Sequence, residues 1–154
     1  MVEFVDFIAA YGKEVGLPDL RLNEDNLCSL NFDSKINVDI VFRKEQDQCI
    51  FASKIGEIPL ENKETFFKEL LKANAFGIET AGASLGIDEE NNSVVFSYIF
   101  ITQSFVYELF KTVLNNFVDL VEKWMQKLED LEKVNDLTMD NEMPFSNPAN
   151  FIHA

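Results

Sequence analysis

The chain has 154 residues, of which 47% are hydrophobic, and this is enough for one domain with a substantial core. Its 27 acidic and 13 basic residues give a formal net charge of −14. A surface dominated by carboxylates repels nucleic-acid phosphates and anionic lipid headgroups, so we expect neither nucleic acid nor a membrane as a partner.

The first part of the chain predicts a helix followed by three strands. Apolar residues at steps of three and four predict a helix over 2–16, which a glycine and a proline end. Alternation of apolar and polar residues then predicts strands over 26–32, 36–43 and 49–55. Short polar turns join these strands, so we expect an antiparallel meander.

A second helix and two further strands are predicted next. Residues 62–77 have helical spacing, with Asn62 as the expected N-cap and Gly77 as the left-handed residue that closes the helix. Strands are predicted over 81–87 and 94–101. The second of these is apolar on both faces, so we expect both of its faces to be covered.

A long amphipathic helix is predicted over 103–133. Beyond it the composition shifts to Asn, Asp, Met and Pro, and two prolines prevent a helix from continuing. We therefore expect 1–133 to form one α+β domain of order α-β-β-β-α-β-β-α, with a twisted antiparallel sheet packed against helices. We expect 134–154 to be a disordered C-terminal tail.

Residues suited to catalysis or metal binding are sparse. The single histidine, His153, falls in the predicted tail, which disfavours Ser-His-Asp and Cys-His catalysis. Cys28 and Cys49 are expected to face the core, on strands about 9 to 10 Å apart, too far for a disulfide and too few for zinc. The acidic turn 88–92 lacks the alternating acids and central glycine of an EF-hand loop. We expect no catalytic residue, no cofactor and no metal, and a paired-carboxylate enzyme ranks last among the functions considered.

The start of the chain gives no sign of export. It has no basic region before an apolar one, and no run of the sequence approaches the length of apolar residues that spans a membrane. With only two cysteines, a reduced cytosolic setting is the expectation.

Several short segments stand in a distinctive order along the chain: Gly16-Leu17 with Leu20-Arg21-Leu22, Cys28 to Asp33, Leu70 to Asn74, Leu85 to Glu90, and Asn116 to Trp124. In this order they resemble the Tir chaperone family, the class I chaperones of bacterial type III secretion. The resemblance implies an acidic homodimer in the bacterial cytoplasm. It implies that the dimer binds the N-terminal segment of a secreted effector in extended, export-competent form without ATP. The secretion-system ATPase is a further implied partner.

The resemblance also implies two surfaces. Effector contacts are implied on the first helix and the meander, namely Phe4, Ile8, Leu27, Leu30, Phe32, Val38 and Val41. A dimer interface is implied on the second helix and the strands after it, namely Phe67, Leu71, Asn74, Phe76 and Leu85. Any of these could instead be ordinary core. Val41 and Leu27 stand out because they are apolar on a face otherwise lined by polar side chains, so we expect them in an exposed patch.

One alternative comes from a different class of function. A regulatory or sensory α/β domain of the same layout would recognise a folded partner or a small ligand, rather than an unfolded export substrate. The state of the bound partner distinguishes the two, because an extended segment stays sensitive to protease and a compact partner is protected.

Overall fold

The computed structural model describes residues 3–142, which form three α-helices and one five-stranded antiparallel sheet. The elements in chain order are α1 (Phe4–Glu14), β1 (Leu27–Phe32), β2 (Ile36–Arg43), β3 (Gln48–Glu57), α2 (Lys63–Asn74), β4 (Ser84–Asp88), β5 (Ser93–Ile101) and α3 (Tyr107–Glu142). Short 3₁₀ turns lie at η1 (Lys44–Gln46), η2 (Ala75–Gly77) and η3 (Thr102–Ser104). The predicted fold class and order of elements are confirmed.

The strand order in the sheet is β1-β2-β3-β5-β4. The first three strands form the expected meander, because their connections are short turns. β5 then pairs with β3 over its whole length, and β4 pairs only with β5. The two edges of the sheet are therefore β1 and β4, which the sequence had left open.

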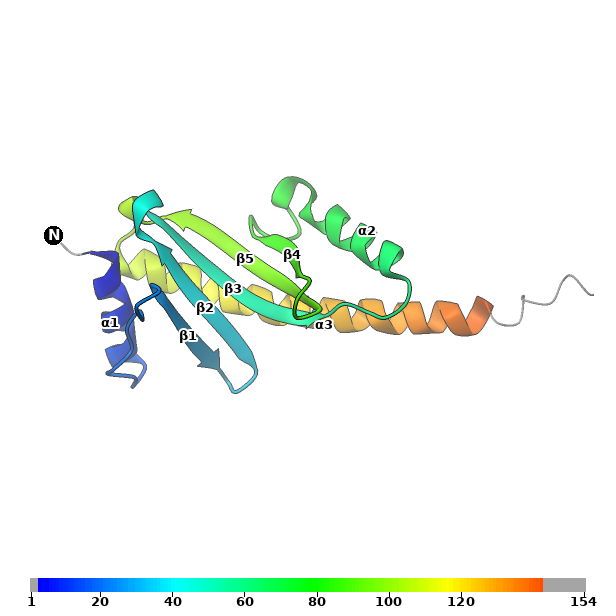
Figure 1. Ribbon diagram of the computed structural model, residues 1–154, viewed down its shortest axis with the longest axis horizontal. Coiled ribbons are helices and arrows are strands. Elements are labelled where there is room, and N and C mark those ends of the chain that lie inside the picture. Colours follow the sequence, from blue (N-terminus) through cyan, green and yellow to red (C-terminus); the bar gives the residue numbers. More distant parts are fainter. Residues whose placement is uncertain (1–2, 143–154) are drawn as a thin grey trace, which may run out of the picture.

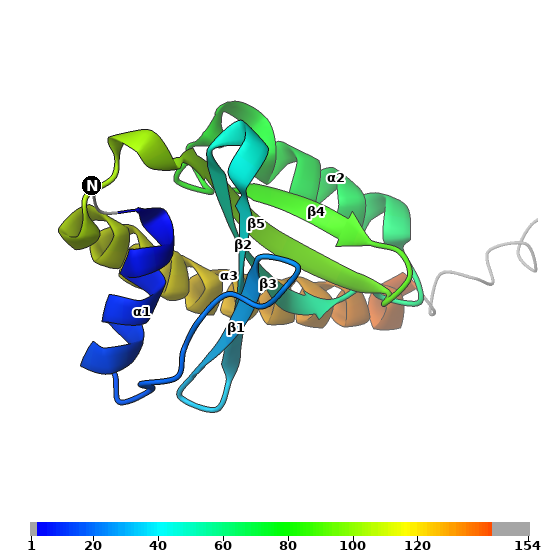
Figure 2. The ribbon, with the colours of Figure 1, turned by 60° about the vertical axis from the view of Figure 1, so that its left-hand side comes forward.

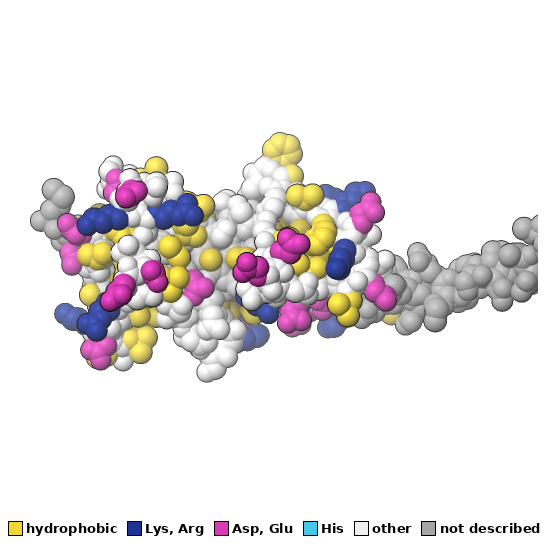
Figure 3. All heavy atoms as spheres, viewed as in Figure 1, with side chains coloured by type: hydrophobic (Ala, Val, Ile, Leu, Met, Phe, Trp, Pro, Cys, Tyr) yellow, Lys and Arg dark blue, Asp and Glu magenta, His cyan; other side chains and the backbone are white. Residues whose placement is uncertain are grey.

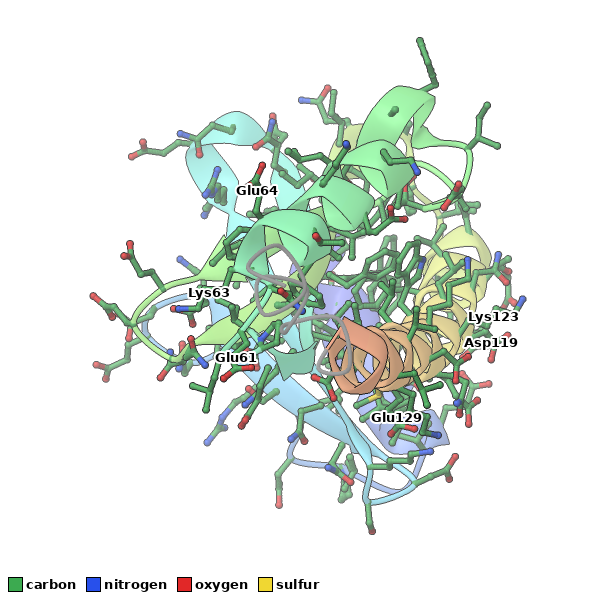
Figure 4. The ribbon with its side chains drawn as sticks, turned by 90° about the vertical axis from the view of Figure 1, so that its right-hand side faces the viewer. Glu61, Lys63, Glu64, Asp119, Lys123 and Glu129 are labelled. Atoms are coloured by element: carbon green, nitrogen blue, oxygen red, sulfur yellow. The ribbon has the colours of Figure 1, made fainter. Side chains whose placement is uncertain are left out.

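The helices gather on one face of the sheet. In Figure 1 the sheet lies in front of α3, which runs along the molecule and past the end of the strands, and Figure 2 shows α1 beside the β1 end. Figure 4, viewed from the end of α3, shows α2 beside α3 with side chains filling the space between helices and sheet.

Aromatic rings hold α3 and α1 against this face. Phe117 of α3 lies 5.7 Å from Phe51 of β3 and 5.6 Å from Phe96 of β5, measured between ring centroids. Phe4 of α1 meets Phe110 of α3 edge to face at 5.5 Å. Each buried ring removes a large apolar area from water, so these ring contacts stabilise the packing of both helices against the sheet.

The opposite face of the sheet carries no helix within residues 3–142 (Figures 1 and 2). Ile99 and Ile101 of β5 point to this face and are 54% and 58% exposed. The expectation that both faces of 94–101 are covered is therefore wrong for the single chain. The reason is that all three helices pack on the side of Phe96 and Phe100.

Two ends of helices differ from the sequence predictions. α3 continues to Glu142 instead of ending at 133, because Asn, Asp and Thr weaken a helix without excluding it, and Pro144 is the first residue that does. Residues 143–154 of the expected tail, with His153, lie outside the described residues. Asn62 occupies the N-cap position of α2 with a left-handed backbone (φ 57°) and makes no capping bond, since a capping side chain needs an extended backbone. Gly77 is left-handed as expected (φ 66°), one short turn after the helix ends.

Candidate functional site

An apolar row crosses the open face of the sheet. The strand register places Leu27 of β1 opposite Val41 of β2, Val41 opposite Ile50 of β3, and Ile50 opposite Ile99 of β5. Directly opposed side chains on neighbouring strands are in contact. Leu27, Val41 and Ile50 are half-buried by one another, and Ile99 is exposed. We call these four residues the apolar row.

Polar pairs border the apolar row. On the next two rows of the same face, the Ser29 hydroxyl donates a hydrogen bond to the Asp39 carboxylate, and Asn31 Nδ2 donates to Asn37 Oδ1 at 2.6 Å. Figure 3 views this side of the molecule and shows apolar side chains near α1 with charged ones around them. An apolar centre with a polar rim is the usual anatomy of a protein-binding surface.

The edge strand β1 directs alternate backbone groups away from the sheet. The Phe42 N–H donates to the Asn26 carbonyl at 2.9 Å, and this bond shows which residues of β1 turn their backbone groups toward β2. Even-numbered residues of β1 therefore bond to β2, and the N–H and C=O groups of Leu27, Ser29 and Asn31 point outward.

Only one of these three residues is capped. The Leu27 N–H donates to Asn23 Oδ1 at 3.0 Å, and the Leu27 carbonyl accepts from the Asn23 N–H at 2.9 Å. For Ser29 and Asn31, no outward backbone group is bonded to another residue of the described chain. β1 thus offers a short stretch of free strand edge next to the apolar row.

The other edge, β4, is closed near its start. Asn74 Nδ2 donates to the Leu85 carbonyl at 2.9 Å, and the Leu85 N–H donates to Asn74 Oδ1 at 2.8 Å. The side-chain amide therefore occupies the place of a neighbouring strand's peptide group. A partner strand meets an obstacle on β4 that it does not meet at Ser29 and Asn31 of β1.

Polar contacts fix the end of α1 against α3. Tyr107 Oη donates to Glu14 Oε2 at 2.6 Å, and Lys111 Nζ lies 3.0 Å from Glu14 Oε1. The hydrogen bonds from Tyr107 and then Lys111 lower the pKa of the Glu14 carboxyl. Burial, followed by the Glu14 contact, raises the pKa of Tyr107, so this phenol stays a hydrogen-bond donor.

The structure separates the predicted effector contacts into two groups. Leu27 and Val41 are neighbours in the apolar row, and Phe32 is half-buried at the end of β1. Four others lie in the core, with exposures between 0% and 7%: Phe4, Ile8, Leu30 and Val38. All four are largely buried, although Phe4 also lines a surface hollow with Phe42 and Phe105. Their role as effector contacts stays a prediction.

The predicted dimer residues also divide. Leu71 and Phe76 are 70% and 95% exposed, and Phe67 is half-buried. Asn74 and Leu85 bond to each other, and Leu85 is only 7% exposed, so both stabilise the chain's own fold. Their role in a dimer interface stays a prediction. Ile78, which is 80% exposed beside them, was missed because the connection after α2 has no periodic pattern to place its side chains.

Sequence reasoning also missed Ile50 and Ile99 of the apolar row. Each stands at an alternating position of a correctly predicted strand, so its face could have been assigned. What brings them together is the pairing of β3 with β5, which connects distant parts of the chain and has no local signal.

Other kinds of site receive little support within residues 3–142. No three His, Cys, Asp or Glu side chains gather there as metal ligands. Cys28 and Cys49 are free and buried, as expected. No helix in the described range is both long and apolar enough to cross a membrane.

Comparisons with known proteins agree with the fold. The model of the Tir chaperone protein (CesT) family matches residues 6–125. The transcriptional anti-antiactivator ExsC of Pseudomonas aeruginosa is 25% identical over 121 residues, which cover 79% of this chain and 82% of ExsC. A chain of the ExsC–ExsE complex superposes with a TM-score of 0.71 at 21% identity, covering 81% of this chain and 96% of that one. A chain of the HopA1–SchA chaperone–effector complex gives 0.63 at 10% identity, covering 79% and 91%.

Proposed function

The chain belongs to the Tir chaperone (CesT) family, and on this premise we propose that it is a type III secretion chaperone. It binds the N-terminal segment of a secreted effector in extended form and keeps that segment soluble and ready for export without ATP. The observation that carries the proposal is the apolar row beside the free edge at Ser29 and Asn31. No catalytic step is required, because binding alone withholds the segment from folding and aggregation.

The effector segment binds as an added strand at β1. Its backbone pairs with the outward N–H and C=O groups of Ser29 and Asn31, which gives affinity that does not depend on the sequence of the segment. Its alternate side chains extend the apolar row beyond Leu27. Each further apolar side chain buried there contributes about 1 kcal/mol, since complete burial of such a residue is worth roughly twice as much.

The high negative charge is part of this function. A chain whose apolar side chains are exposed in the absence of a partner tends to associate with itself. The net charge of −14 opposes this association and keeps the free chaperone dispersed.

Three further parts of the proposal follow from the family. The chaperone is a homodimer, for which the exposed Leu71, Phe76 and Ile78 offer an apolar contact surface. It resides in the bacterial cytoplasm, where the effector is synthesised. The secretion-system ATPase is its partner at the point of export.

Capture of an effector segment tests the proposal. The probe is the N-terminal segment of the secreted protein encoded beside the chaperone gene, coexpressed with the tagged chaperone. Leu27→Asp places a charge at the end of the apolar row that the added strand covers and should weaken capture about tenfold or more, because that charge must be desolvated on binding. The control is Leu60→Asp, the same change at an 88% exposed leucine in the connection between β3 and α2. Equal capture by wild type and Leu27→Asp would contradict the proposed site.

A regulatory function is the second candidate, and the similarity to ExsC, a transcriptional anti-antiactivator, favours it. In that case the partner is a folded regulatory protein. Limited proteolysis of the complex separates the candidates: a bound segment that remains cleavable along its length supports the chaperone, and a compact protected partner supports the regulator.

A further inference from the structure

Phe76 is held away from its own domain by the backbone. It has a left-handed conformation (φ 62°), which bulky side chains rarely adopt, and its ring is 95% exposed. The turn that carries it is fixed on both sides, by the bonds of Asn74 to Leu85 and by the Gly82 N–H, which donates to the Gly77 carbonyl at 2.9 Å. Figure 3 shows an apolar side chain standing out above the end of α2.

An apolar hollow of about 170 Å³ opens beside the same connection. Its lining comes from the segment after η2, from β5 and from α3: Ala81, Ala83, Tyr98, Val113, Asn116, Phe117 and Leu120. An apolar cavity of about 150 Å³ is large enough for benzene. The hollow therefore has room for one phenyl ring, and Phe76 of the same chain does not fill it.

The connection between α2 and β4 shows further signs of strain. Ala81 at the rim of the hollow is also left-handed (φ 51°), and the buried hydroxyl of Thr80 has no hydrogen-bond partner in the described chain. Such costs persist where they serve a function. Here they hold a projecting ring and an open hollow in fixed positions on one patch of the surface.

We propose that Phe76 of each protomer inserts into this hollow of a second copy of the chain. This inference deepens the proposed homodimer and rests on it. In a two-fold symmetric interface the same patch of both chains is in contact. The ring of each chain can therefore enter the hollow of the other, which gives two equivalent contacts. The exposed Leu71 and Ile78 lie near the ring in sequence and enlarge the apolar contact.

The dissociation constant of the dimer, measured by sedimentation of the chain alone, tests the insertion. Phe76→Ala removes both rings and should raise this constant by about 100-fold or more, as truncation of a central aromatic anchor does. Asn116→Trp should raise it as well, because the indole fills the hollow from its rim. The matched control is Asn115→Trp, which changes the neighbouring exposed residue of α3 outside the hollow. Constants within twofold of wild type for Phe76→Ala and Asn116→Trp would overturn the inference.

Cross-linking identifies the contact itself. A mixture of Phe76→Cys and Asn116→Cys chains should form a disulfide-linked heterodimer under mild oxidation. Cys28 and Cys49 are buried, and burial raises the pKa of Cys28 to about 11, so they do not compete. Linkage of Phe76→Cys to itself alone would overturn the inference, because the rings would then meet at the symmetry axis.

Effector capture separates this inference from the proposed function. A wild-type monomer that still captures the effector segment overturns the insertion and leaves the chaperone function supported. Loss of capture with intact dimerisation in Phe76→Ala also overturns it, because the exposed ring then contacts the effector segment and not a second copy of the chain. Loss of capture in Leu27→Asp with the Phe76–Asn116 linkage intact supports both statements.

Discussion

Single asparagine side chains decide which edge of the sheet is available. Asn23 caps Leu27 at the start of β1 and leaves the next two outward residues free. Asn74 caps Leu85, the second residue of β4, and this strand is only five residues long, so little free edge remains. The sequence pattern placed Asn74 at the end of a helix, and the family resemblance implied a role in dimer contact. The structure assigns it to the chain's own sheet, a contact that depends on the path of the connection between α2 and β4.

Replacing Asn74 should therefore destabilise the fold. Asn74→Ala removes two hydrogen bonds to Leu85, and at about 1 kcal/mol each the free energy of unfolding should fall by about 2 kcal/mol. Asn74→Asp retains the acceptor for the Leu85 N–H but turns its second carboxylate oxygen toward the Leu85 carbonyl, so it should not restore the lost stability. Urea denaturation measures both, with Asn115→Ala, on the exposed face of α3, as the control. An Asn74→Ala variant as stable as the control would show that the two hydrogen bonds between Asn74 and Leu85 do not contribute to the free energy of unfolding.

The Glu14 cluster makes one part of the stability depend on pH. The pKa of Glu14 is lowered in the folded chain by Tyr107 and Lys111, so its contribution is present above the unfolded pKa and is lost as the pH falls through the folded pKa. The difference in free energy of unfolding between wild type and Glu14→Gln should therefore shrink from pH 7 to pH 3. Glu122→Gln, on the exposed face of α3, is the control. A difference that stays constant over this range would contradict the assigned contacts.

At the scale of elements, local periodicity predicts the strands and helices well, and pairing between distant elements lies beyond it. Alternation placed β2 at its observed bounds because both of its turns are short and polar. The partnership of β3 with β5 passes over α2 and β4, and no local pattern encodes it. This is why Val41 and Leu27 could be singled out from the sequence, whereas Ile50 and Ile99 were not joined to them.

The packing of α1 provides a test at this scale. Glycine inside a helix is normally about 1 kcal/mol worse than alanine. At Gly12, however, an added Cβ would lie 2.5 Å from the Leu17 carbonyl oxygen and 2.6 Å from Leu20 Cβ. Gly12→Ala should therefore destabilise the chain, by about 1 to 3 kcal/mol. Thermal unfolding measures the change, with Lys13→Ala, at an exposed position, as the control. A stabilised Gly12→Ala variant would mean that the chain after α1 does not pack against it as described.

At the scale of the whole molecule, packing every helix on one side leaves the other face of the sheet open. The helical side contains the aromatic core and, beside α2, the ring and hollow that suit a second copy. The open side contains the apolar row and ends at the free edge of β1. In the proposed dimer, one chain would therefore use separate surfaces for self-association and for a bound segment, and each copy would keep its open face.

Hydrogen exchange at β1 tests the central claim most directly. Amide exchange of the 154-residue chain is followed with and without the N-terminal segment of the secreted protein encoded beside it. We predict that the segment slows exchange at the outward amides of Ser29 and Asn31, because they become donors to the added strand. Binding of the segment with unchanged exchange at both amides would contradict strand addition at β1.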